Sequence, residues 1–380
     1  MFKETVDFIR KHYGTDQFIP LHEPRFLGKE KEFLNECIDS TFVSSVGPFV
    51  DLFEKTIAEY TGAKHAIAIT NGTLALHMAL VVAGVKKNDL VITQPLSFIA
   101  TCNAISYLDA QPLFIDIDRN TLGLSPAKLS DFLKANTEIK NGECFYKKTG
   151  QRISACVPMH TFGLAIRIQE LVDVCEKYKI VLVEDAAESL GTKVGNKHTG
   201  TFGKLGVFSF NGNKTVTCGG GGAIVTDDLN LAKLAKHLST QAKVPHRWEF
   251  VHDAIGYNYR MPNLNAALAC AQLEQLEGFI EDKRKTANAY ETFFQGKITL
   301  VKEMPGTRSN YWLNAILLED KKERDEFLTF TNDNGVMTRP VWELMNRLSM
   351  FKDAICDSLE NSEWIADRLV NIPSSVRINK

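Results

Sequence analysis

The sequence lacks the marks of several large protein classes. Its eight cysteines are scattered over 380 residues with no CxxC pair, which argues against a zinc site or a secreted disulfide framework and favours reduced thiols in a cytoplasmic protein. We therefore expect no metal site. No apolar run approaches the roughly 18 residues of a membrane span, and the first residues lack the apolar stretch of a signal peptide.

A strong charge of either sign is also absent. The formal net charge is -2 at pH 7, so the composition does not indicate a surface for nucleic acid or an anionic membrane. The chain is 44% hydrophobic and 24% charged, which is ordinary for a globular protein. Its length is sufficient for two domains.

Short apolar runs alternate with helix-length amphipathic segments in the first two thirds of the chain. Several runs are apolar at nearly every position, which is typical of strands covered on both faces. The expected strands are 65–70, 90–93, 112–117, 155–159, 180–185, 207–210 and 223–226, and the expected helices between them include 74–84 and 168–178. This alternation predicts an α/β fold with a mostly parallel sheet.

The pattern changes after about residue 240. A long helical stretch at 263–294 leads into a smaller region of mixed pattern. We therefore expect a large α/β domain at 1–245 and a small C-terminal α+β domain at 246–380. The polar segment 136–152 has the pattern of a hairpin inserted into the large domain.

Candidate site residues follow the expected strands, at the carboxyl ends where ligands of open α/β sheets bind. Gly72 and Thr73 begin a helix after the first strand, and free N–H groups with a hydroxyl suit a phosphate. A plain helix cap by Thr73 is the alternative. Ser209 could supply a second hydroxyl, and Phe98 could lie flat on an aromatic ring or simply pack in the core.

Two charged residues complete this set. Asp185 ends an apolar strand and needs a partner there, which could be a helix end, an arginine or a cationic ring nitrogen. Lys214 lies between a strand and four glycines, and is either a solvated loop lysine or an amine that forms a Schiff base with a carbonyl. Phosphate donors, a stacking ring, a carboxylate and an amine are together what pyridoxal phosphate requires.

These motifs in combination resemble a known family. GTLAL, SFIAT, VEDAAESLG, FSFNGNK followed by glycines, and GYNYRM occur in the order found in the DegT-type (DegT/StrS) nucleotide-sugar aminotransferases, and the likeness covers nearly the whole chain. The resemblance implies a three-layer fold type I pyridoxal-phosphate transferase. It also implies a homodimer with each active site at the subunit interface, and transfer of an amino group from glutamate to a nucleotide-linked keto sugar.

The resemblance also implies roles for single residues, carried over by matching motif positions. Lys214 is expected to form the Schiff base, and Asp185 to bind the pyridine nitrogen. The other expected contacts are Gly72, Thr73 and Ser209 with the phosphate, Phe98 with the ring face, Asn258 with the phosphate in the neighbouring subunit, and His160 with the substrate.

Two positions depart from the family pattern. Glu188 stands where Gln or His is usual near the cofactor's phenolic oxygen, and Gly219–Gly222 replaces Gly-Glu-Gly-Gly. The inserted hairpin and VSSVG at 43–47 look most like a subgroup near the legionaminic acid pathway. That likeness implies amination at C4 of a UDP-4-keto-6-deoxy-N-acetylhexosamine for surface polysaccharide or nonulosonic acid biosynthesis.

Three other functions are weighed against this one. A sugar dehydratase that resembles the same scaffold would carry histidine in place of Lys214. A non-catalytic regulator that only binds the cofactor or a nucleotide sugar would not need both Lys214 and Asp185. A Rossmann-type oxidoreductase would need a GxGxxG turn after its first strand, whereas the glycine run here follows the lysine.

Overall fold

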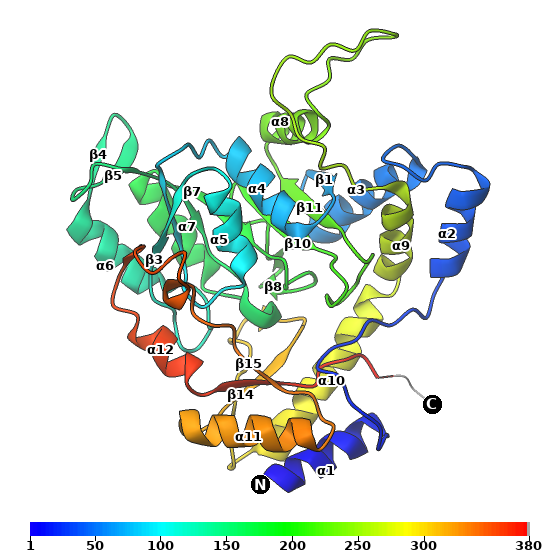
Figure 1. Cartoon of the computed structure of the whole chain (residues 1–380), viewed down its shortest axis with the longest axis vertical. Coiled ribbons are helices and arrows are strands. Elements are labelled where there is room, and N and C mark those ends of the chain that lie inside the picture. The colour runs from blue at the N-terminus through cyan, green and yellow to red at the C-terminus, as the bar shows by residue number, and fades with distance from the viewer. Residues whose placement is uncertain (378–380) are drawn as a thin grey trace.

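The computed structural model describes residues 1–377 and is built of helices packed on two larger sheets, with one small sheet besides (Figure 1). The helices are α1 (Phe2–Tyr13), α2 (Glu30–Asp39), α3 (Pro48–Thr61), α4 (Gly72–Val82), α5 (Ile99–Ser106), α6 (Pro126–Asn136), α7 (Ile168–Tyr178), α8 (Leu229–Ser239), α9 (Asn263–Leu273), α10 (Leu276–Phe294), α11 (Lys321–Asp333) and α12 (Glu360–Ala366), with short 3₁₀ turns η1 (Thr161–Gly163) and η2 (Met345–Arg347). Within the described residues, no helix combines the length and the hydrophobicity that crossing a bilayer requires.

The large sheet has ten strands. Its main path runs β1 (His65–Ile69), β11 (Gly222–Thr226), β10 (Leu205–Ser209), β7 (Val181–Asp185), β6 (Arg152–Val157), β2 (Leu90–Thr93), β3 (Gln111–Phe114) and β16 (Ile355–Cys356). Neighbours from β10 to β16 are parallel, and β11 is antiparallel to both of its partners. The predicted hairpin is present as β4 (Thr137–Lys140) and β5 (Glu143–Tyr146), which pairs with β6. The mostly parallel sheet is therefore confirmed.

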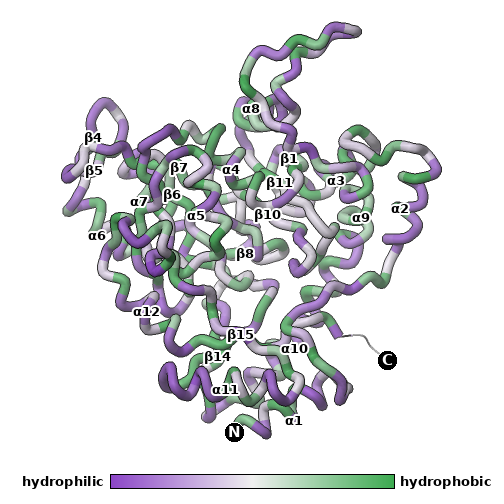
Figure 2. Tube along the Cα trace, viewed as in Figure 1, coloured by the Kyte–Doolittle hydropathy of each residue, from purple (hydrophilic) through white to green (hydrophobic). Residues whose placement is uncertain are grey.

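Helices cover both faces of this sheet because successive strand residues point to opposite sides. Val207 of β10 belongs to a buried cluster with residues of α4, α5 and α8. Its neighbour Phe208 lies in a cluster with α3 and α9, and Ile92 of β2 packs with α6 and α7. Figure 2 shows hydrophobic residues along the central strands between these helices. The fold is thus the three-layer α/β architecture that the sequence predicts.

A second, antiparallel sheet orders the C-terminal region. Its strands are β12 (Thr299–Leu300), β14 (Asn314–Leu317), β17 (Leu369–Ile372) and β15 (Arg339–Pro340), and a small sheet of β13 (Thr307–Arg308), β8 (Lys193–Val194) and β9 (Lys197–His198) joins this region to the large one. Residues of α1, α10 and α11 share one apolar cluster with the second sheet. The first helix of the chain therefore packs with the C-terminal region.

Two expectations about boundaries are refined. The stretch 263–294 is two helices, because α9 ends at Leu273 and α10 begins at Leu276; α9 packs with α2 and α3, whereas α10 packs with the second sheet. Strand β6 stops at Val157, since Pro158 lacks the N–H that would continue the ladder. The division at residue 245 stays a prediction, and the elements that pack across it include α1, α9, β13 and β16.

Candidate active site

A cavity of about 510 Å³ lies at the carboxyl ends of β7 and β10, between the large sheet and the C-terminal region. This volume is within the range of about 300–1,000 Å³ that small-molecule sites occupy. The predicted residues that line the cavity are Gly72, Thr73, Phe98, Asp185, Glu188, Ser209 and Lys214. Residues up to 142 positions apart in the sequence thus share one wall because parallel strands end at the same edge.

The N-terminus of α4 forms one end of the cavity. The Asn71 side chain caps this helix by accepting a hydrogen bond from the Leu74 N–H at 2.9 Å, so the alternative cap by Thr73 is wrong. The first N–H groups of a helix have no partner within it, and they favour an anion. A side chain at Gly72 would put its Cβ 2.8 Å from the Ser209 Cβ, so glycine permits the close approach of α4 to β10.

Asp185 is buried at the end of β7. Its Oδ2 accepts a hydrogen bond from the Thr101 hydroxyl at 2.7 Å, and its Oδ1 accepts one from the Ala187 N–H at 3.2 Å. Burial raises the pKa of the Asp185 carboxyl, and these two hydrogen bonds and the charge of Lys214 oppose the rise. No arginine pairs with Asp185 in the described residues, so the carboxylate remains available to a cationic group in the cavity.

Lys214 is held by two partners. Its Nζ lies 3.1 Å from Oε1 of Glu188 and 4.0 Å from the centre of the Trp312 ring, and its side chain is only 13% exposed. The reading of Lys214 as a solvated loop lysine is therefore wrong. Burial raises the pKa of Glu188 to about 7, although the Lys214 charge and a hydrogen bond from the Phe162 N–H oppose that rise.

Aromatic side chains line part of the cavity. Phe98 is 46% exposed and its ring lies 5.9 Å from that of Trp342, so it is not a core residue. Sequence reasoning missed Trp312, Trp342 and Tyr107, which also line the cavity. Two of them come from the C-terminal region, and no local pattern in the sequence connects that region to the strand ends.

Two predicted residues lie outside the cavity wall. His160 is completely buried, and its Nε2 lies 3.0 Å from Oε2 of Glu184, so its side chain has no surface for a substrate in this conformation. Asn258 is exposed, and its Oδ1 accepts a hydrogen bond from Nε of Arg260. Their roles stay predictions.

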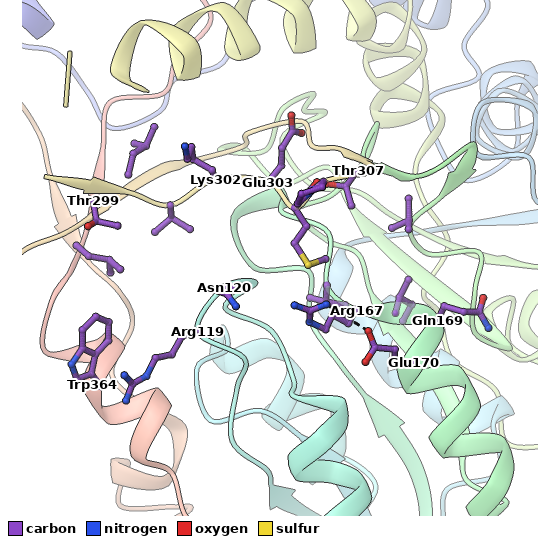
Figure 3. Close-up of a pocket in the computed structure, with 18 residues that line it drawn as sticks. Arg119, Asn120, Arg167, Gln169, Glu170, Thr299, Lys302, Glu303, Thr307 and Trp364 are labelled. Carbon is purple, nitrogen blue, oxygen red and sulfur yellow. Dashed lines mark hydrogen bonds and ion pairs between the residues drawn. The ribbon is translucent and has the colours of Figure 1, made fainter. Parts of the chain in front are cut away.

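A larger cavity of about 810 Å³ lies elsewhere, between α7, the loop at Arg119 and the C-terminal strands (Figure 3). Its charged groups are mostly paired: Arg167 binds Asp118 at 2.7 Å and approaches Glu170, whereas Glu303 binds Arg284. It contains none of the predicted site residues. Within residues 1–377 no cluster of histidine, cysteine and acidic side chains is suited to a metal ion.

The smaller cavity has the features of a pyridoxal phosphate site. It offers a buried carboxylate, a buried amine, the N-terminal N–H groups of α4 and an exposed aromatic ring, each of which matches one part of that cofactor. A three-layer α/β fold with this set at its carboxyl edge defines the class of fold type I pyridoxal-phosphate enzymes.

Comparison with known proteins identifies the family. The chain belongs to the DegT/DnrJ/EryC1/StrS aminotransferase family, whose model matches residues 26–380. It is 35% identical to GDP-perosamine synthase of Escherichia coli O157:H7 over 94% of this chain and 93% of the relative. It is 34% identical to a putative pyridoxal phosphate-dependent aminotransferase, EpsN, of Bacillus subtilis over 92% and 88%. This chain is thus a pyridoxal-phosphate-dependent sugar aminotransferase.

Solved structures agree with this assignment. A DegT DnrJ EryC1 StrS aminotransferase from Brucella abortus superposes with a TM-score of 0.85 at 26% identity, covering 93% of this chain and 91% of that one. The predicted family, fold class and cofactor are therefore confirmed.

Replacing Thr101 by valine tests how far the buried carboxylate depends on its neighbours. The change keeps the shape of the side chain but removes the hydrogen bond to Asp185 Oδ2. We expect the free energy of unfolding to fall by about 1–3 kcal/mol, because a buried carboxylate loses a partner. Urea denaturation measures this change. Thr101→Ser, which keeps the hydroxyl, should lose less, and equal stability of Thr101→Val and the wild type would contradict the argument.

Proposed function

We propose that this enzyme moves an amino group from glutamate to C4 of a nucleotide-linked 4-keto-6-deoxy sugar, and that the sugar is UDP-4-keto-6-deoxy-N-acetylhexosamine. The product would serve surface polysaccharide or nonulosonic acid biosynthesis. The observation that carries the proposal is the presence of Lys214 and Asp185 in one cavity beside the N-terminus of α4. The curated relative named GDP-perosamine synthase supports an activated sugar as the substrate.

Each part of the cavity has a proposed task. Lys214 attaches the cofactor through its amine, and Asp185 holds the pyridine nitrogen in its protonated form. Gly72, Thr73 and Ser209 bind the phosphate through N–H and hydroxyl groups, and Phe98 covers a face of the ring. Bound pyridoxal phosphate supplies an electron sink that allows a C–H bond next to nitrogen to break.

Proton transfer would be the task of the Lys214 amine when it is not attached to the cofactor. The amine is suited to this task because it is released at the position where the proton must be moved. Asp185 contributes a fixed negative charge, and a preorganised charge of this kind commonly supplies several kcal/mol of transition-state stabilisation. The aromatic rings of Phe98, Trp312 and Trp342 line the cavity, and apolar rings of this kind would limit the access of water to both groups.

We also propose that two chains share each active site. Asn258 is exposed and does not line the cavity of its own chain. The nearby segment 243–255 extends away from the body of the molecule beyond α8 (Figure 1), and it exposes Trp248, Phe250 and Ile255 by 70%, 79% and 89%. Large exposed apolar side chains on one segment are typical of an interface. A two-fold dimer would bring Asn258 to the partner's cofactor phosphate.

A panel of nucleotide keto sugars tests the proposed reaction. The purified enzyme is incubated with pyridoxal phosphate, glutamate and either UDP-linked or GDP-linked 4-keto-6-deoxy sugars, and aminated products are identified by mass spectrometry. We expect the UDP-linked N-acetyl sugar to be aminated and Lys214→Ala to give no product. Amination of the GDP-linked sugar alone would contradict the proposed substrate. Absence of product from every sugar, with the cofactor bound, would contradict the proposed reaction.

Mixed dimers test the shared site. A chain with Lys214→Ala and a chain with Asn258→Ala are each expected to be strongly impaired alone. Their heterodimer should recover part of the activity, because it contains one doubly damaged site and one intact site. Tagged chains verify that the subunits exchange. If tagged heterodimers form and remain inactive, Asn258 does not serve the partner's site.

A further inference from the structure

Two contacts fix the Lys214 amine in the cavity. Its Nζ has a carboxylate oxygen of Glu188 at 3.1 Å on one side and the Trp312 ring at 4.0 Å on the other. Trp312 is itself anchored, since its indole N–H donates a hydrogen bond to the Asn213 carbonyl at 2.7 Å. A carboxylate and an aromatic face both attract a cation, so both contacts hold the end of the Lys214 side chain at this position.

Glu188 is fixed as firmly as the amine that it holds. Its second oxygen accepts a hydrogen bond from the Phe162 N–H at 2.9 Å, and its backbone carbonyl accepts one from the Asn310 side chain at 2.8 Å. Phe162 adopts a left-handed conformation with φ 57°, which costs free energy for a residue with a bulky side chain. Strain of this kind persists only where the surroundings impose it. The strained turn at Phe162 therefore indicates that the hydrogen bond from its N–H, which fixes the Glu188 carboxylate, matters for function.

We propose that Glu188 is a positioning residue for the reaction: its carboxylate holds the Lys214 side chain at the cavity wall, as the ammonium ion, whenever the amine is not attached to the cofactor. The proposal rests on the proposed role of Lys214. An amine that is released in each half of the reaction needs a defined resting position, because a long flexible side chain otherwise loses the geometry that proton transfer requires. Glu188 would provide that position in every turnover.

The other charged groups near the pair are few. Asp185 raises the pKa of Glu188, whereas Lys214 lowers it. His22 lies behind Trp312 with 6.5 Å between the ring centroids, and burial holds the pKa of His22 well below its usual value. His22 is therefore neutral at pH 7, and it adds no positive charge to compete with Lys214 for Glu188. With the pKa of Glu188 at about 7, the negative partner is present above that pH and disappears below it.

The test measures how fast an amine-specific reagent labels Lys214 in the full-length chain freed of cofactor. Glu188→Gln keeps an oxygen for the Phe162 N–H but removes the charge that holds the ammonium ion. We expect labelling of Lys214 above pH 7 to become about tenfold faster in Glu188→Gln, since the Coulomb attraction that holds Nζ at the cavity wall is worth a factor of this order or more and is lost in the variant. Below about pH 6 the two rates should converge, because Glu188 is then protonated in the wild type. Peptide mass spectrometry reads the rate for each lysine.

Glu54→Gln is a matched control. Glu54 also accepts a backbone hydrogen bond, from Ala68, and also pairs with a lysine, Lys236, at 2.6 Å. Its replacement should leave labelling of Lys214 unchanged. The buried Lys283, which donates to two carbonyl groups, must stay unlabelled if the fold is intact.

Equal labelling of Lys214 in the wild type and Glu188→Gln across the pH range would overturn the proposal. If Glu188→Gln does not fold, Glu188→Asp replaces it, because the shorter side chain withdraws from Nζ. A rate in Glu188→Asp equal to that of the wild type would overturn the proposal in the same way. Neither measurement uses a sugar or an amino donor, so a wrong substrate assignment leaves both results interpretable.

Discussion

The site depends on one constraint, which is that two carboxylates and an amine are buried together at the ends of β7 and β10. Asp185 and Glu188 are each only 3% exposed, and a charge removed from water to this degree is costly unless it is paired or hydrogen-bonded. Lys214, Thr101 and the backbone of Phe162 meet this requirement. The left-handed turn at Phe162, for example, directs its N–H to the Glu188 carboxylate.

The same constraint links the large sheet to the C-terminal region. Asn310 donates to the Glu188 carbonyl, and a side chain at Gly163 would put its Cβ 1.8 Å from Oδ1 of Asn310, so the left-handed turn after Phe162 is fitted closely to this contact. Trp312 follows Asn310 by two residues and contacts the amine of Lys214. A short segment of the C-terminal region thus closes the cavity, and its position is set by hydrogen bonds to the large region.

The sequence predicted the strands and the residues that follow them because both depend on local patterns. Continuous apolar runs identify buried parallel strands, and chemistry at the carboxyl ends of such strands converges on one edge. Three features could not be predicted in this way: the Trp342 ring in the cavity wall, the hydrogen bond from Thr101 to Asp185, and the break between α9 and α10. Each depends on packing between segments far apart in the chain, for which a single sequence carries no periodic signal.

The central claim is that this buried cavity binds pyridoxal phosphate through Lys214. Borohydride reduction of the cofactor-loaded protein, followed by proteolysis and mass spectrometry, tests the claim most directly because it makes the attachment permanent at the lysine that carries it. The account predicts that the visible absorption disappears on reduction and that the cofactor is found on the peptide containing Lys214. Attachment to another lysine, such as the buried Lys283, or no attachment at all, would contradict it.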